Sequence, residues 1–360
     1  MNFSNLAFIL TDDCNFDCSY CRQKKEKIVM EPSTVKKAVR FFYPFLDKEA
    51  YIIFYGGEPL LAFDKIKTAV SLLQEQDNEG EKKLNFSITT NGSLLNDENL
   101  EFFQRHGFSI MLSYDGLAQG SQRKAGSRVP TRALIERLQS NAYPGIAFSI
   151  NSVFTPATAE YLFASLCDMM ETGANEIQLS FAHDQPWQDS DLHALENQLQ
   201  RLRAFLVSYY REKGIIPVTN YRRRKPRPKG KKCFFCDGGR GRMAVTPAGN
   251  LWGCLLFHGY LKGKEDSGDF RTYSFGSLDD FIEDYAGIYP RILANYSSLR
   301  QDCFFTEETF CFLCPAVENC GVCPVSAAYS TGVIGKMPPW MCGLKGILRK
   351  EEEEFLNAVK

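Results

Sequence analysis

Three cysteines near the start of the chain, Cys14, Cys18 and Cys21, are the residues whose type and spacing most directly indicate chemistry. They follow a short apolar run, Leu6–Leu10, which has the composition of a buried strand. Three thiolates on one loop can bind three irons of a 4Fe–4S cube, and the fourth iron is then left without a protein ligand. An open coordination position is typical of catalytic metal sites. The structural alternative is a zinc knuckle, although zinc favours CxxC pairs and four ligands.

Eight further cysteines lie in the last third of the chain, and their paired spacing is also typical of metal ligands. They are Cys233, Cys236, Cys254, Cys311, Cys314, Cys320, Cys323 and Cys342. Eight thiolates are enough for two clusters with four ligands each, and two structural zinc sites are the alternative. Of the other two cysteines, Cys167 lies in an apolar helical stretch and is expected in the core, and Cys303 is given no role.

Bulk composition limits the class of protein. A chain of 360 residues with 44% apolar residues can form one large domain or two, and a net charge of −1 argues against a general nucleic-acid surface. The first residues lack a signal-peptide pattern, and no apolar run approaches the ~20 residues that span a membrane. We therefore expect a cytoplasmic protein whose cysteines bind metal rather than form disulfides, and oxygen-labile clusters would suit anaerobic chemistry.

Strand and helix patterns alternate from residue 6 to about residue 213. The expected strands are Leu6–Leu10, Tyr51–Tyr55, Asn85–Thr89, Ser109–Ser113, Ala147–Val153 and Glu176–Phe181. One expected helix begins at Pro32. The others cover Phe63–Gln76, Asp97–His106, Thr131–Gln139, Ala157–Thr172 and Asp189–Lys213. Six such units predict an α/β fold with a parallel sheet, helices outside it and functional loops at the carboxyl ends of the strands.

Those strand ends contain further polar and glycine residues. The second strand is followed by Gly56, Gly57 and Glu58; the glycines allow the backbone to approach a ligand closely, and the carboxylate could receive an ammonium group. The third strand is followed by Asn91, and the fourth ends near Asp115. Turn composition alone would explain the last two equally well.

The CxxxCxxC spacing, with Tyr20 before the last cysteine, resembles that of the radical S-adenosylmethionine (SAM) superfamily. The resemblance implies a partial (β/α)6 barrel, and a cluster on Cys14, Cys18 and Cys21 whose open iron chelates SAM and releases a 5′-deoxyadenosyl radical. It implies that Glu58 contacts the amino group of SAM and Arg123 its carboxylate. The implied SAM contacts are Tyr20, Gly56, Gly57, Glu58, Asn91, Ser113, Asp115, Arg123 and Ser180.

The stretch from Cys233 to Cys342 resembles the SPASM domain, an extension of a radical SAM subgroup that binds two auxiliary 4Fe–4S clusters. The resemblance implies Cys233, Cys236, Cys254 and Cys323 as ligands of the first cluster, and Cys311, Cys314, Cys320 and Cys342 as ligands of the second. The first pair is a tight CxxC and the gap from Cys320 to Cys323 is one residue short, so the partition between the clusters stays open.

The two resemblances divide the chain into a barrel at residues 1–213, a basic linker at 214–232, a SPASM domain at 233–345 and a carboxyl-terminal helix at 346–360. The linker is expected to be a solvated charge run, or else a contact for an acidic peptide. In the SPASM segment, a hairpin is expected where Arg242–Val245 and Asn250–Cys254 flank a turn, and little other regular structure, so that metal would be needed for folding. The acidic run Glu351–Glu354 is expected to be solvated.

The resemblance implies an oxidoreductase that cross-links or oxidises a side chain of a ribosomally made peptide or protein, with flavodoxin or ferredoxin as reductant. Sulfatase-maturating relatives have an aspartate base where this chain has Leu255. Because the first strand begins at residue 6, no leader-recognition domain is expected upstream, and a leader would need a separate partner protein or direct contact. The alternatives are a sulfatase-maturase-like enzyme, a small-molecule dehydrogenase and a non-catalytic electron carrier, the last disfavoured by Glu58. The general base stays unassigned.

Overall fold

A curved, mainly parallel sheet is the centre of this computed structural model, which describes residues 1–125, 131–140, 142–222, 236–299, 311–314, 317 and 321–360. Within those residues the strand order is β11-β10-β9-β1-β3-β4-β5-β7-β8. The six expected strands are confirmed and all run parallel. Their bounds are β1 Phe3–Ile9, β3 Leu46–Tyr55, β4 Lys83–Thr90, β5 Ser109–Ser113, β7 Ala147–Phe154 and β8 Ile177–Phe181.

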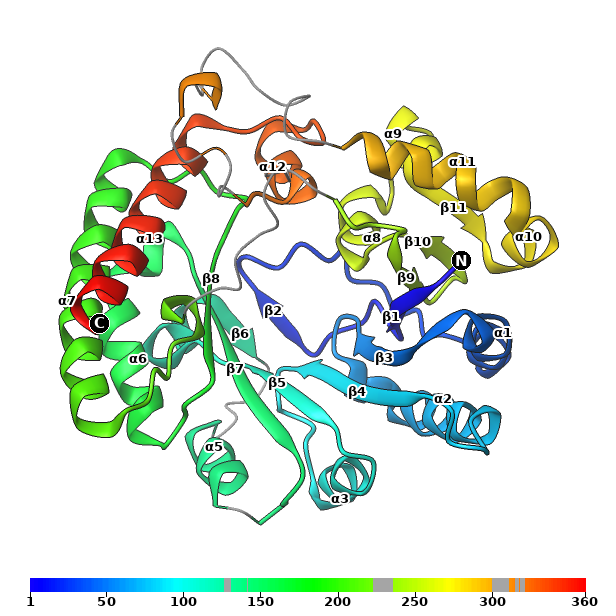
Figure 1. Cartoon of the computed structure of the whole chain (residues 1–360), viewed down its shortest axis with the longest axis horizontal. Helices are drawn as coiled ribbons and strands as arrows, with labels where there is room; N and C mark the ends of the chain where they lie inside the picture. The colour runs from blue at the N-terminus through cyan, green and yellow to red at the C-terminus, as the bar shows by residue number, and fades with distance from the viewer. Residues whose placement is uncertain (126–130, 141, 223–235, 300–310, 315–316, 318–320) are drawn as a thin grey trace.

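The helices between these strands cover the outer side of an open arc (Figure 1). They are α1 Pro32–Phe42, α2 Phe63–Gln76, α3 Asp97–Arg105, α5 Thr131–Gln139, α6 Leu162–Glu171 and α7 Asp189–Lys213. In α1 the periodic apolar residues, Val35, Ala38, Val39 and Phe42, are the buried ones, as the pattern predicts. The expected helix Ala157–Thr172 is divided, because a 3-10 turn at Pro156–Tyr161 precedes α6.

Stacked phenylalanines hold neighbouring strands of the barrel together. The rings of Phe8 and Phe54 are 6.0 Å apart, those of Phe54 and Phe108 are 5.8 Å apart, and those of Phe86 and Phe108 are 5.3 Å apart. All four are buried. Such pairs add about 1 kcal/mol each beyond the burial of area, so this row stabilises the part of the sheet from which the polar loops project.

The carboxyl-terminal part continues the same sheet. Strand β9 (Gly241–Val245) pairs in parallel with β1, β10 (Asn250–Trp252) pairs antiparallel with β9, and β11 (Ser274–Ser277) with β10. The expected hairpin is therefore confirmed.

The expectation of little further regular structure in this segment is wrong. Its described helices are α8 Leu255–Leu261, α9 Gly268–Tyr273, α10 Leu278–Glu283, α11 Tyr285–Ser298 and α12 Pro324–Thr331. They enclose buried aromatic residues: the Tyr296 hydroxyl donates to the Tyr273 carbonyl (2.8 Å) and accepts from Gly253 N (3.0 Å), and the Phe257 ring lies 4.7 Å from the Tyr296 ring. These aromatic residues belong to the same buried core as Phe3 of β1 and Phe42 of α1.

Only the first part of the basic linker is described, and it packs on the barrel. Val218 forms a parallel bridge with Ile177, Tyr221 is buried, and Arg222 donates to both carboxylate oxygens of Glu176 at 2.8 Å. Residues 223–232, with most of the expected charge run, lie outside the described residues. No helix in the described ranges is long and apolar enough to cross a membrane.

The final helix, α13 (Pro339–Ala358), begins seven residues earlier than expected and lies beside α7 (Figure 1). The acidic run on it is not wholly solvated. Glu351 is 1% exposed and accepts a hydrogen bond of 2.7 Å from Arg203 Nε on α7, and Arg203 also pairs with Glu354 at 2.9 Å. A buried carboxylate needs such a partner, so this pair fixes the last helix to the barrel.

We expect Glu351→Ala to lower the free energy of unfolding by about 2 kcal/mol, because it removes a charged hydrogen bond and leaves Arg203 to pair with the more exposed Glu354. Glu353→Ala on the same run is the control, since Glu353 is exposed, and should change stability by less than about 0.5 kcal/mol. Urea unfolding of the three proteins measures the difference. Equal effects of the two substitutions would contradict the role given to Glu351.

Candidate metal and cofactor site

The three-cysteine loop contains a short strand, β2 (Phe16–Cys18), that lies inside the arc of the sheet (Figure 1). This strand pairs antiparallel with β6 (Arg123–Ala125), with Cys18 opposite Arg123. Ser19 N donates to Gln122 O at 2.8 Å. The segment that supplies β6 follows β5 through a 3-10 turn (Gly116–Ala118) and α4 (Gln119–Gln122). The loop is therefore positioned by main-chain pairing with the barrel.

The thiols of this loop influence one another electrostatically. The pKa of the Cys18 thiol is raised to about 11, mainly by burial; Arg123 opposes the increase, and the nearby Cys21 and Cys14 contribute to it. Burial also raises the pKa of Cys14, and the hydrogen bond from Phe16 N to its sulfur (3.4 Å) opposes this. Neighbouring half-buried thiols of this kind become stable thiolates when a metal neutralises them.

The donor set fits a cube. In the described ranges no three His, Cys, Asp or Glu side chains converge on the position of one metal ion. A cube does not require such convergence, because each thiolate binds a different iron and the sulfurs stay apart.

Asp115 binds two of the other residues expected at the site, Tyr20 and Arg123. It is fully buried and accepts hydrogen bonds from Tyr20 Oη (2.9 Å), Arg123 Nε and Nη2 (2.6 and 2.9 Å), Gln122 Nε2 (2.7 Å) and Val153 N (2.9 Å). Burial holds the pKa of Tyr20 well above its ordinary value, so its phenol donates to Asp115. The Arg123 guanidinium thus pairs with Asp115, and its expected contact with the SAM carboxylate stays a prediction.

Gly56 and Gly57 face the cysteine loop. Gly57 N donates to Thr11 O and Glu58 N to Asp13 O, both at 2.8 Å. A Cβ atom on Gly56 would overlap the carbonyl oxygen of Thr11, and one on Gly57 that of Asp13. The structure therefore gives a reason for glycine that the sequence did not reveal: the loop after β3 packs directly on the main chain before Cys14.

The Glu58 carboxylate is fully buried at the end of β4. It accepts from Thr90 Oγ1 (2.7 Å), Leu60 N (3.1 Å) and Asn91 N (2.8 Å), and burial raises its pKa to about 7. Asn91 in turn donates to Asn15 Oδ1 at 2.9 Å. Glu58 and Asn91 therefore lie together beside the cysteine loop, and their expected contacts with SAM stay predictions.

Ser113 and Ser180 lie at the carboxyl ends of β5 and β8, with Asn151 of β7 between them. Ser180 Oγ donates to Asn151 Oδ1 at 2.8 Å, and Ser113 stands opposite Asn151 in the strand register. Sequence reasoning missed Asn151, although an amide near the carboxyl end of an expected strand was a visible signal. Its position places it with the expected site residues on the same edge of the sheet.

Asp12 is a second residue that the sequence did not single out. Its carboxylate is 4% exposed and contacts Lys262 Nζ (2.7 Å) and His258 Nε2 (3.0 Å), which belong to the carboxyl-terminal part of the chain. Burial alone would raise the pKa of Asp12, but these two partners hold it below its ordinary value. No sequence pattern links residues 246 positions apart.

Three of the four expected ligands of the first auxiliary cluster are described, and they influence one another. The pKa of Cys236 is raised to about 12, mainly by burial and with smaller contributions from Cys254 and Cys323. Cys254 immediately precedes α8 and Cys323 immediately precedes α12. The fourth, Cys233, lies outside the described residues.

The second auxiliary set is described in part. Cys314 N donates to Cys311 O at 3.2 Å in a tight turn, and Cys342 lies in α13. Cys320 and the unassigned Cys303 lie outside the described residues. All these ligand assignments stay predictions.

Cys167 is half-buried in α6.

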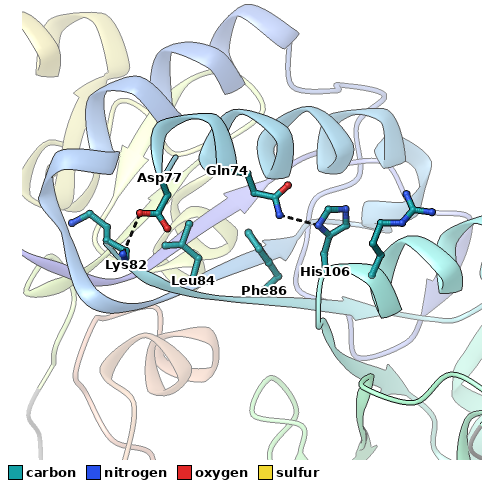
Figure 2. Close-up of a pocket in the computed structure, with 7 residues that line it drawn as sticks. Gln74, Asp77, Lys82, Leu84, Phe86 and His106 are labelled. Atoms are coloured by element: carbon teal, nitrogen blue, oxygen red, sulfur yellow. Dashed lines mark hydrogen bonds between the residues drawn. The ribbon is translucent and has the colours of Figure 1, made fainter. Parts of the chain in front are cut away.

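A shallow pocket of about 400 Å³ lies at the opposite end of the barrel (Figure 2). It is formed by the ends of α2 and α3 and the start of β4, and Gln74, Asp77, Lys82, Leu84, Phe86, Arg105 and His106 line it. Its polar groups bind one another, as in the contact of Gln74 with His106 at 3.1 Å. Because it is at the amino ends of the strands, it is separate from the cysteine loop.

Residues 8–171 match the family model of the radical SAM superfamily. The radical SAM cyclopropyl synthase TigE of Paramaledivibacter caminithermalis is 22% identical over 372 aligned residues, which cover 95% of this chain and 72% of TigE. A cysteine-type anaerobic sulfatase-maturating enzyme of Clostridium perfringens is 27% identical over 161 residues, which cover 41% of this chain and 43% of that enzyme.

Solved structures share the fold along nearly the whole chain. Native anSMEcpe with bound AdoMet has a TM-score of 0.75 at 17% identity and covers 99% of this chain and 98% of its own. Streptococcus suis SuiB bound to its precursor peptide SuiA has a TM-score of 0.57 at 16% identity and covers 93% of this chain and 75% of its own. The expected fold class, a radical SAM partial barrel with a carboxyl-terminal extension, is confirmed.

The buried Glu58 predicts a pH dependence of stability. Its pKa is about 7 in the folded protein and about 4.3 when unfolded, so the native state binds more protons between these values. The free energy of unfolding should therefore fall as pH rises from about 4.5 to 7, by up to about 3 kcal/mol.

Glu58→Gln should remove that slope, whereas Glu49→Gln should retain it because Glu49 lies on an exposed surface. Anaerobic urea unfolding at several pH values between 4.5 and 8 measures both variants. An unchanged slope in Glu58→Gln would mean that another group titrates in this range.

Proposed function

We propose that this chain is a radical SAM enzyme that reductively cleaves SAM and uses the product radical to oxidise or cross-link a side chain of a ribosomally made peptide or protein. One observation supports this most strongly. The loop with Cys14, Cys18 and Cys21 is joined by hydrogen bonds to both the Glu58 and the Asp115 loops at the carboxyl edge of the barrel.

In this proposal Cys14, Cys18 and Cys21 hold the catalytic cluster through their thiolates. When bound, the cluster and SAM supply a one-electron reduction that yields methionine and 5′-deoxyadenosyl chemistry. The residues of the chain bind and orient SAM. A carboxylate has about four lone-pair directions, and Glu58 uses three of them for Thr90, Leu60 and Asn91. The fourth would receive the ammonium group of SAM.

The auxiliary sets would then serve the second half of the reaction. Cys233, Cys236, Cys254 and Cys323 would hold one cluster, and Cys311, Cys314, Cys320 and Cys342 the other. When bound, they would accept the electron that remains after hydrogen abstraction or bind the substrate. An external flavodoxin or ferredoxin would reduce the catalytic cluster.

Names and structures of similar proteins support a peptide or protein substrate. The similar proteins include sulfatase-maturating enzymes, and SuiB binds a precursor peptide. A leader peptide would be recognised by a separate partner protein or by direct contact. Leu255, the first residue of α8, argues against the sulfatase-maturation reaction itself, because its aliphatic side chain cannot act as the base.

Replacing Cys14, Cys18 and Cys21 together by alanine should remove roughly a third of about twelve irons per chain and abolish formation of 5′-deoxyadenosine. The parent protein, anaerobically reconstituted and reduced, should form 5′-deoxyadenosine and methionine from SAM even without substrate. Cys167→Ala, which changes a thiol with no assigned ligand role, is the control and should behave as the parent.

Iron and acid-labile sulfide analysis and chromatography of the reaction provide the measurements. Zinc without sulfide would refute the cluster assignment. A full iron content with no cleavage of SAM would favour an electron carrier instead.

Cys254→Ala should lower the iron content by roughly a third and leave 5′-deoxyadenosine formation in place, because Cys254 is assigned to an auxiliary cluster. Circular dichroism should show whether the segment stays folded, since metal binding and folding are coupled in such segments. A folded variant that has lost SAM cleavage would assign Cys254 to the catalytic cluster and contradict the proposed partition.

A further inference from the structure

The three-cysteine loop is attached to the carboxyl-terminal part of the chain by one charged side chain on each flank. Asp12 lies two residues before Cys14, and Arg22 lies immediately after Cys21. Both reach across to helices that begin at cysteines of the first auxiliary set. We call Asp12 and Arg22 the two anchors.

The first anchor binds the end of α8. Asp12 contacts Lys262 Nζ at 2.7 Å and His258 Nε2 at 3.0 Å, and the exposed fractions of the three side chains are 5%, 11% and 12%. Lys262 also donates to Lys24 O at 2.8 Å, so the same ammonium group binds the chain both before and after the three cysteines. Charged contacts this well buried are costly to break, because each partner would be left unpaired away from water.

The second anchor binds α12. The Arg22 guanidinium lies over the ring of Tyr329, 4.6 Å from its centroid, and forms an ion pair with Asp184 beyond the end of β8. A guanidinium can stack and pair at once because it is planar. Arg22 therefore connects the cysteine loop both to the barrel edge and to the carboxyl-terminal part.

The two helices that receive the anchors are themselves fixed at the auxiliary cysteines. Cys254 precedes α8 and Cys323 precedes α12, and both pack against the same buried core as Cys236. The helices also pack together, since the rings of Tyr260 and Tyr329 are 5.3 Å apart and Tyr260 Oη donates to Gly332 O at 2.8 Å. The contacts of α8 and α12 thus join the two groups of cysteines.

We propose that Asp12 and Arg22 are positioning residues that fix the catalytic cysteine loop against the first auxiliary cysteine group through α8 and α12. The proposal depends on the proposed function in one respect only, namely that both groups of cysteines are cluster ligands. The consequence is that the order of the cysteine loop, and the separation of the two clusters, depend on contacts made by the carboxyl-terminal part of the chain.

The test uses the anaerobically reconstituted protein and the variants Asp12→Asn and Lys262→Gln for the first anchor and Arg22→Gln for the second. Hydrogen–deuterium exchange of peptides covering residues 11–30 should become roughly tenfold faster, the change that a loss of about 1.4 kcal/mol of local protection produces. Lys262→Gln is decisive, because it lies outside the cysteine loop and should still loosen residues 11–30.

Glu26→Gln is the matched control. Glu26 is half exposed and lies 3.3 Å from the same Lys262 Nζ, so it removes a carboxylate beside the anchor without touching the buried contact. Its exchange should match the parent. Arg22→Lys, which retains the charge opposite Asp184 but loses the stacked guanidinium, should fall between the parent and Arg22→Gln.

A second readout reports on the clusters. The electron paramagnetic resonance of the reduced protein with SAM should relax differently in Asp12→Asn and Arg22→Gln than in the parent and Glu26→Gln, because spin relaxation depends on the distance to a neighbouring cluster. If Lys262→Gln accelerates exchange only near residue 262, or if exchange and relaxation match the parent at equal iron content, the proposal is wrong. If the parent protein instead lacks clusters or does not cleave SAM, the proposed function is wrong. The exchange of residues 11–30 would still show whether the two anchors hold the cysteine loop in place.

Discussion

Burial of the Asp115 carboxylate is the constraint on which the site most depends. An ionised group with no exposure is stable only if its oxygens are occupied by donors, and here the donors come from the cysteine loop, from α4 and β6, and from β7. Tyr20 is the donor from the cysteine loop, so satisfying Asp115 also determines where that loop lies. The two-residue separation of Tyr20 from Cys18 then fixes the thiols relative to the barrel.

Glu58 applies the same constraint from the other side of the loop. Its three donors are the hydroxyl of Thr90 and the main-chain N–H groups of Leu60 and Asn91, none of which is charged. Neutral donors compensate burial less than a guanidinium does, and this explains why the pKa of Glu58 is raised to about 7. A site that binds a cation beside Glu58 would restore the ionised form. Asp115 is thus built to be complete within the protein, whereas Glu58 retains capacity for a ligand.

The barrel could be predicted from the sequence because each of its strands is a short apolar run between amphipathic helices, and such runs have few other conformations. Strand β2 was missed because three residues with an aspartate and a cysteine have no strand pattern, and only pairing with β6 makes them extended. The helices around Tyr296 were missed because their stability comes from aromatic contacts between distant segments. Glu351 looked solvated because Arg203, its partner, is 148 residues away. The local sequence pattern therefore predicted most of the barrel's helices and strands, whereas the contacts between distant segments could be seen only in the structure.

Strand β9 shows that the carboxyl-terminal part is not a separate domain, because β9 belongs to the same sheet as the barrel strands. It lies beside β1 in a parallel register that places Leu6 opposite Met243 and Phe8 opposite Val245. A shift of one residue would move Met243 and Val245, both buried, to the other face of the sheet, so the register is strongly specified. The carboxyl end of β1 leads into Cys14, and the hairpin after β9 leads into Cys254. The main chain therefore sets the coarse separation of the two cysteine groups, and side-chain contacts such as Asp12 with Lys262 determine their final orientation.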